Sequence, residues 1–137
     1  MAQTAAAKVL VVGSVNGRLA EFFAKVQKLD AKHGPFAVLL VTGNLFAEGA
    51  VSDEEVGPLL RDEIPIPIMT YVIVGDRGLP RRVGERAALR SGEICSNLAV
   101  LAGQGVLQTS EGVRIAYISG RYALSKEAVT HEADQSE

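Results

Sequence analysis

The sequence KVLVVGSVNGRLAEFFAKVQKLDAKHGPFAVLLVT, residues 8–42, decides the fold of this chain. It begins with a β-branched run, residues 8–13, and ends with a second apolar run, residues 36–42. Both runs are continuously apolar, which predicts buried strands with both faces covered. Between them, apolar residues recur at helical spacing from Leu19 to Leu29, which predicts a helix. A strand, a helix and a strand in this order are typical of an α/β domain.

The ends of the predicted helix carry recognisable signals. Asn16 is a favoured N-cap type, so we expect it to begin the helix. His33, Gly34 and Pro35 end it, because Gly supplies the C′ conformation and Pro cannot continue a helix. His33 is therefore interpreted as a helix-end residue rather than as a metal ligand or a base.

The rest of the chain continues the alternation. Ser52 and Glu55 have capping-box spacing, so a short helix is expected to begin there, interrupted early by Gly57 and Pro58. The other elements expected are strands at 68–74, 97–102 and 113–119, a helix at 81–90 and an additional hairpin strand at 104–110. With 47% hydrophobic residues among 137, residues 1–122 are expected to form one α/β domain with a mostly parallel central sheet flanked by helices. Residues 123–137 are expected to be a polar tail, helical or disordered.

Composition excludes several classes of protein. The formal net charge of −2 differs from the basic balance of typical nucleic-acid-binding domains, and the arginines from Arg77 to Arg90 are interpreted as a solvated helix face. The single Cys95 forms no internal disulfide, which suits the cytosol or nucleus, and it is interpreted as a small buried hydrophobe. No stretch approaches the ~20 apolar residues of a membrane span, so no membrane partner is expected.

Three predicted strands each end in Gly followed by a polar loop, at residues 13–17, 43–44 and 75–78. Ligand sites in open α/β sheets lie outside the carboxyl ends of the strands, so these loops are expected to form the binding surface. Val15 and Arg18 replace two glycines of a dinucleotide fingerprint, and only three residues separate Gly13 from Gly17, whereas a phosphate-binding P-loop needs four. The candidate binding residues are Asn16, Arg18, Asn44, Asp76 and Arg77.

The combination of the three loops resembles the calcineurin-like metallophosphoesterases, whose first strands end in Gly-Asp-x-His-Gly, Gly-Asp and Gly-Asn-His. The resemblance implies the first half of that fold, in which these side chains hold two metal ions. On those motifs, this chain has Ser14 for the first Asp, Asn16 for the His, Asn44 for the bridging Asp, Asp76 for the Asn and Arg77 for the catalytic His.

These replacements remove the negative charge that a pair of divalent cations needs. Ser14 and Asn44 are neutral, and Arg77 would add a positive charge beside the metals. We therefore expect no metal, no cofactor and no catalytic residue, and a domain that binds rather than catalyses.

A longer stretch, residues 9–46, resembles the start of the CwfJ-type splicing factors, also called Cwf nineteen-like proteins. The motifs that carry this resemblance are Gly17-Arg18, Phe23-Ala24-Lys25-Val26-Gln27, Gly34-Pro35-Phe36-Ala37 and Thr42-Gly43-Asn44-Leu45-Phe46. Later pieces extend it to about residue 122, including Ala116-Tyr117-Ile118-Ser119-Gly120. Some plant members are called CCCH zinc-finger proteins, but this chain has no such Cys/His cluster, so no zinc is assigned.

The resemblance implies a nuclear, spliceosome-associated factor of mRNA splicing or intron-lariat turnover. Its partners would be the lariat debranching enzyme, other spliceosomal proteins or RNA. Family members continue past this point, so the sheet is expected to expose an edge through which the chain self-associates.

Two alternatives stay open at this point. A metal-dependent phosphoesterase with a rearranged site would have to use Asp76, Asp53, Glu54 or His33. A nucleotide- or phosphate-binding α/β module would hold its anion at the helix N-terminus capped by Asn16.

Overall fold

The structure, a computed structural model, describes residues 7–48, 50–74 and 78–119, without the side chains of residues 50–53. The predicted tail, residues 123–137, lies outside these ranges. Along the chain the elements are β1 (Val9–Val12), α1 (Leu19–His33), β2 (Val38–Val41), α2 (Ala50–Leu60), β3 (Thr70–Ile73), α3 (Arg81–Leu89), β4 (Glu93–Cys95), β5 (Leu98–Leu101), β6 (Gln104–Gln108) and β7 (Arg114–Ile118).

The central sheet has the strand order β1-β2-β3-β5-β4. The first four strands of that order are parallel, with Leu10 opposite Leu39, Leu39 opposite Thr70, and Thr70 opposite Leu98. Strand β4 joins the far edge antiparallel to β5. The predicted α/β class and mostly parallel sheet are confirmed.

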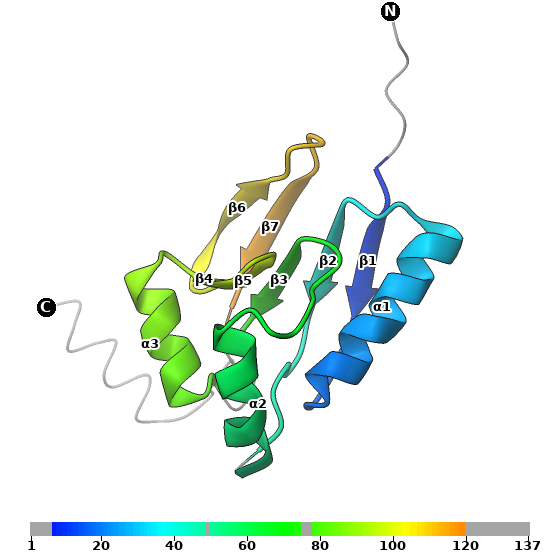
Figure 1. The fold of residues 1–137 in the computed structure, drawn as a ribbon. Coiled ribbons are helices and arrows are strands. Elements are labelled where there is room, and N and C mark those ends of the chain that lie inside the picture. Colours follow the sequence, from blue (N-terminus) through cyan, green and yellow to red (C-terminus); the bar gives the residue numbers. More distant parts are fainter. Residues whose placement is uncertain (1–6, 49, 75–77, 120–137) are drawn as a thin grey trace, which may run out of the picture.

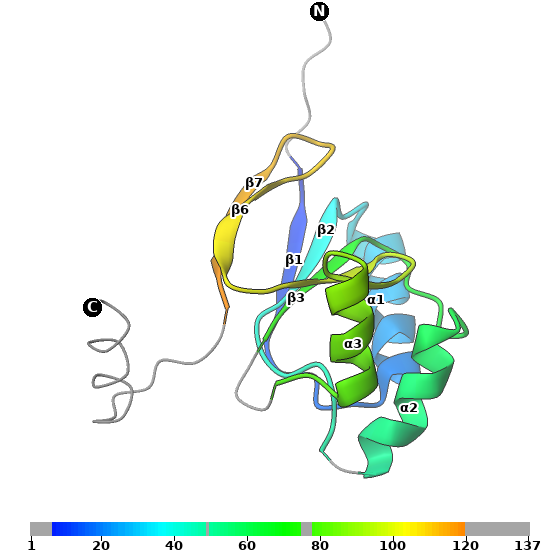
Figure 2. The same ribbon diagram turned by 90° about the vertical axis from the view of Figure 1, so that its left-hand side faces the viewer.

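The helices and the hairpin lie on opposite faces of this sheet (Figures 1 and 2). Parallel strands that follow one another in order are joined by crossovers of the same hand, which places α1, α2 and α3 on one face. The antiparallel hairpin of β6 and β7 covers part of the other face. The expectation that both faces of the first strand are covered is wrong, because Val11, on the hairpin side of β1, is 57% exposed.

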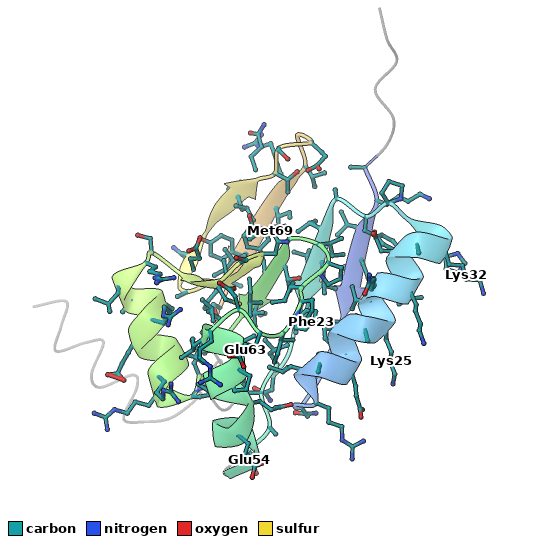
Figure 3. The ribbon with its side chains drawn as sticks, viewed as in Figure 1. Phe23, Lys25, Lys32, Glu54, Glu63 and Met69 are labelled. Carbon is teal, nitrogen blue, oxygen red and sulfur yellow. The ribbon has the colours of Figure 1, made fainter. Side chains whose placement is uncertain are left out.

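The core lies between the sheet and the helices. The sheet and α1 contribute the almost completely buried residues Leu39, Val41, Val72, Leu98, Leu19, Phe23 and Val26. Figure 3 shows Phe23 pointing toward the sheet, while Lys25 and Lys32 point away from it. The helical spacing identified this face correctly except at Leu29, which is 41% exposed.

Helix α1 begins and ends for reasons other than those predicted. Asn16 is not its N-cap: Arg18 holds that position, and the first helical N–H, that of Leu19, donates to Oε1 of Glu55 at 2.8 Å. The helix does stop at Gly34, whose N–H donates to the Asp30 carbonyl. However, Gly34 has φ −86°, so it is required because a Cβ would collide with that carbonyl, and not because it is left-handed.

Two further elements differ from the prediction. Helix α2 begins at Ala50, before Ser52, and continues through Gly57 and Pro58. Packing of the last turn of α2, which includes the buried Leu59, offsets the hydrogen bond that Pro58 cannot make. The short strand β4 was missed, whereas the hairpin of β6 and β7 is confirmed.

The sheet face beneath the hairpin is less tightly packed than the helix-covered face. A cavity of about 210 Å³ lies there, lined by Leu40, Tyr71 and Ile73 from the sheet and by Ile115 and Tyr117 from β7, among others. The hairpin is held at the carboxyl end of β3, where the Val74 N–H donates to Oγ of Ser119 at 2.7 Å.

Candidate functional site

The loops that follow β1 and β2 lie side by side at the carboxyl edge of the sheet. The Asn44 carbonyl accepts hydrogen bonds from the N–H groups of Val15 (2.8 Å) and Asn16 (3.0 Å), and the Leu45 carbonyl accepts one from Gly17 (2.9 Å). The structure therefore brings two of the three expected loops together in one backbone-bonded unit.

Three of the five candidate binding residues lie in this unit. Asn16 and Arg18 are exposed, and Asn44 is half-buried. The other two, Asp76 and Arg77, lie outside the described residues. Because β3 is the next strand after β2, its last residue, Ile73, ends at the same edge of the sheet.

The first loop adopts an unusual backbone conformation. Asn16, Gly17 and Arg18 have φ values of 58°, 94° and 55°, so three successive residues are left-handed. Gly and Asn tolerate this region, but for a residue such as Arg18 it costs about 1–2 kcal/mol. Backbone strain of this kind concentrates at functional sites, which makes this loop the leading candidate in the described chain.

The close approach of the two loops depends on Gly43. A Cβ at residue 43 would lie 2.8 Å from the Ser14 backbone nitrogen and 2.9 Å from its Cα. This contact lets the Asn44 N–H donate to Oγ of Ser14 at 3.2 Å. The two neutral residues that replace metal-binding aspartates in the phosphoesterase resemblance thus bond to each other.

The electrostatics of the helix start contradict one expected site. The N–H of Leu19 already donates to the carboxylate of Glu55, and the Oε2 atom of that carboxylate is buried without a hydrogen-bond partner in the described structure. The N–H groups of Val15, Asn16 and Gly17 are also used, by the second loop. Asn16 is therefore not the cap of an anion site, and the Glu55 carboxylate takes the first helical N–H that such a site would use.

Glu55 could not have been found from local sequence. Its spacing from Ser52 suggested a cap for its own helix, α2, but its carboxylate bonds to α1, 36 residues earlier in the chain. Only the tertiary packing of α2 against the start of α1 gives it this role.

The residues proposed for a rearranged metal site are not gathered in the structure. His33 is the last residue of α1, so the length of that helix, about 20 Å, separates it from the carboxyl edge. Glu54 is exposed on α2, as Figure 3 shows, and Asp76 and the Asp53 side chain lie outside the description. Within the described ranges, no three His, Cys, Asp or Glu side chains lie where they could hold a metal ion.

The arginine run is only partly a solvated face. Arg81, Arg82 and Arg90 are exposed, as expected. Arg86 is different, because its guanidinium donates to the carbonyls of Leu60 (3.1 Å) and Ile94 (3.2 Å) and so joins α3 to α2 and β4.

Cys95 is buried, which confirms its interpretation as a small hydrophobe. Burial raises the pKa of its thiol to about 11, and the nearby Asp62 carboxylate adds to this effect. The thiol is therefore protonated at neutral pH and is a poor nucleophile.

A cavity of about 280 Å³ lies beside the first loop, between β1 and α1. Val12, Val15 and Phe22 contribute apolar lining, and the charged lining consists of Arg18, Lys25 and Glu21. No local sequence pattern predicts this cavity, because it arises where the edge strand packs beside α1. None of the described helices is long and apolar enough to cross a membrane.

No family model matches the sequence. Among curated proteins, the CWF19-like protein 1 homolog of Drosophila melanogaster is 37% identical over 116 residues, which are 85% of this chain and 21% of that protein. The Caenorhabditis elegans CWF19-like protein 1 homolog is 35% identical over 124 residues, 90% of this chain and 22% of its own length. The CWF19-like protein mug161 of Schizosaccharomyces pombe is 32% identical over 116 residues, 85% of this chain and 20% of its own length. The homologues of this chain are thus CWF19-like proteins, and it spans about a fifth of their length.

Proposed function

We propose that this chain, whose homologues are CWF19-like proteins, is a non-catalytic interaction domain of a splicing-related factor. The homologues' names and the resemblance to CwfJ-type splicing factors support a role in mRNA splicing or intron-lariat turnover. A protein with that role would work in the nucleus. The reduced, buried Cys95 is compatible with that compartment.

The domain is in this proposal a metallophosphoesterase-like fold that has lost its metal centre. The observation that carries the proposal is the contact between Ser14 and Asn44, which stand where the resemblance places metal-binding aspartates. Both side chains are neutral and supply none of the charge that a pair of divalent cations requires, and the backbone N–H of Asn44 already bonds to the Ser14 hydroxyl. The parallel order of β1, β2 and β3, with polar loops at one edge, supports the fold assignment.

The binding surface in this proposal is the edge formed by the strand-end loops. Asn16, Arg18 and Asn44 lie there in the described structure, and Asp76 and Arg77 complete the set from the third loop. The hydrogen bonds between the first two loops fix the backbone before a partner arrives, which lowers the entropic cost of binding. The proposed partners are the lariat debranching enzyme, other spliceosomal proteins or RNA.

The test is a double substitution, Arg18→Ala with Arg77→Ala, in pull-down and calorimetric assays against purified debranching enzyme and a branched RNA. We expect binding to weaken about tenfold or more, since in this proposal each arginine makes a charged contact with the partner. Arg81→Ala with Arg82→Ala removes the same charge from α3 and serves as the matched control. Equal binding by wild-type protein and the Arg18/Arg77 variant would sink the surface assignment.

A further inference from the structure

We propose that the open edge of β1 and the basic side of α1 together bind an acidic, extended peptide from a protein partner, which adds to the sheet as a further strand. This surface adjoins the strand-end loops and shares Arg18 with them, but it extends along β1 and α1. The inference goes beyond the proposed function, because it names a second contact and the chemistry of the partner.

The first observation is an unpaired strand edge. β1 is the terminal strand of the sheet, and no described strand pairs with its outer side. The carbonyls of Lys8 and Val12 accept hydrogen bonds from Ala37 and Thr42 on the β2 side. Because backbone groups alternate in direction along a strand, those of Val9 and Val11 point outward, where an added strand can pair with them.

The second observation is a line of positive charge along this edge. Arg18, Lys25 and Lys32 are seven residues apart, so they lie on the same side of α1, and all three are exposed. Figure 3 shows Lys25 and Lys32 projecting away from the core. Glu21 is the acidic residue between them, and none of the three basic side chains forms an ion pair with another described residue. A chain of net charge −2 therefore carries a basic strip beside its open edge.

The third observation is a place for one side chain of the added strand. The cavity of about 280 Å³ lies at the carboxyl end of β1, with Val12, Val15 and Phe22 as apolar lining. Arg18, Lys25 and the acidic Glu21 line the same cavity. Because alternate residues of a strand share a face, an apolar side chain with carboxylates two positions before and after it would reach both the cavity and the basic strip.

These features favour an acidic peptide over two other occupants. RNA could use the basic strip, but it would leave the outward N–H and C=O groups of Val9 and Val11 without a strand to pair with. A second copy of this chain, the occupant expected from the sequence, could pair through β1. However, edge-to-edge pairing would bring two copies of the Lys25 and Lys32 strip together, and like charges at an interface are unfavourable.

The test uses fluorescence anisotropy with a labelled Val/Glu peptide, which carries Glu, Val and Glu at alternate positions, so that they share one face, and Thr at the positions between. The same peptide with Gln in place of Glu and a single-stranded oligouridine are the comparison probes. The charge variant is Lys25→Glu with Lys32→Glu. Its matched control is Arg81→Glu with Arg82→Glu, which changes the net charge equally on the distant helix α3.

The edge variant is Val11→Pro, which removes an outward N–H and leaves the hydrogen bonds to β2 in place. Its matched control is Val11→Ala. Circular dichroism verifies that each variant is folded.

We expect the Val/Glu peptide to bind wild-type protein and to bind about tenfold more weakly to both the charge variant and Val11→Pro, with both matched controls close to wild type. The proposal is overturned if the Val/Glu peptide does not bind, or if Val11→Pro binds it normally. Preferential binding of oligouridine that survives Val11→Pro would make the strip a nucleic-acid site. Self-association that Val11→Pro abolishes, without peptide binding, would make the second copy the occupant. Because Arg18 and Arg77 are unchanged in all these variants, failure here leaves the strand-end surface intact.

Discussion

The helix-covered face of the sheet and the two loops at its carboxyl edge are both closely packed, but by different interactions. On the helix-covered face, apolar side chains such as Leu39 and Leu98 are fully buried against the helices. In the loops, backbone hydrogen bonds to Asn44 and Leu45 and the close approach of Gly43 to Ser14 fix the shape. The stability of the core therefore depends on the volume of its side chains. The close approach of the two loops depends on the absence of a side chain at Gly43.

This difference has a consequence for how each region responds to change. A core side chain that is shortened leaves a cavity, and its neighbours relax only in part. A loop that gains one methyl group must move its backbone, which breaks several hydrogen bonds at once. Stability should thus be concentrated in the core, whereas the geometry of the candidate site should depend on single glycines.

The largest expected effect is in the core. Leu39→Ala should lower the free energy of unfolding by about 3–5 kcal/mol, because Leu39 is 0% exposed and its deletion leaves a cavity between sheet and helices. Urea unfolding followed by circular dichroism measures this. Leu40→Ala, the neighbouring half-buried position on the opposite face, should cost clearly less. Equal losses at the two positions would mean that the hairpin side of the sheet is packed as tightly as the helix side.

The next effect is at the close approach of the loops. Gly43→Ala should destabilise the protein by about 1–3 kcal/mol, because the new Cβ collides with the Ser14 backbone. Gly13→Ala is the matched control, since no atom lies within 4 Å of the position of its Cβ. The melting temperatures of the two variants, measured by thermal unfolding, test this prediction. A Gly43→Ala variant as stable as Gly13→Ala would show that the loops adjust without strain.

A smaller effect is expected where the core meets the loops. Glu55→Ala should cost about 1 kcal/mol, because it removes the acceptor of the Leu19 N–H and the negative charge at the start of α1. Glu54→Ala, an exposed neighbour on the same helix, is the control. Amide hydrogen exchange at Leu19 should accelerate in the Glu55 variant only. Unchanged exchange at Leu19 would show that Glu55 does not stabilise the start of α1.

The last effect is absent at neutral pH and appears only in alkaline solution. The folded state raises the pKa of the Cys95 thiol to about 11, so folding favours the neutral thiol. Its contribution to stability is complete below the unfolded pKa of about 8.5 and is lost as pH rises toward 11. Denaturant unfolding of wild type and Cys95→Ala at about pH 7 and about pH 10 should show a steeper decline for wild type. Parallel declines would place the thiol in contact with water.

The contrast between core and loops also explains what could be predicted from the sequence. Helix α1 follows from apolar periodicity and the parallel strands follow from continuous apolar runs, which are both local signals. The same patterns predict the burial of these elements except at Val11 and Leu29. The strand β4 is three residues long and owes its place to pairing with β5, so no period marks it. Helix α2 passes through Pro58 because the packing of Leu59 outweighs a local signal for helix termination.

The candidate site was predictable in position but not in detail. The Gly endings of the strands placed it at the carboxyl edge, where Asn16, Arg18 and Asn44 lie. The left-handed backbone at Arg18 and the bond from Leu19 to Glu55 depend on how distant segments pack, so the expected Asn16 cap was wrong. The basic strip could not be predicted from the sequence. Arg18, Lys25 and Lys32 form a candidate binding surface only because α1 lies beside the open edge of β1.

The most direct test of the central claim is a calorimetric titration of the metal-free protein with Mn²⁺ and Zn²⁺. We expect no stoichiometric binding of either ion, because the side chains of Ser14 and Asn44 supply no charge to a metal pair. Tight binding of two ions per chain would contradict it. In that case the loops at the carboxyl edge would form a metal centre, and the protein should be assayed as a phosphoesterase.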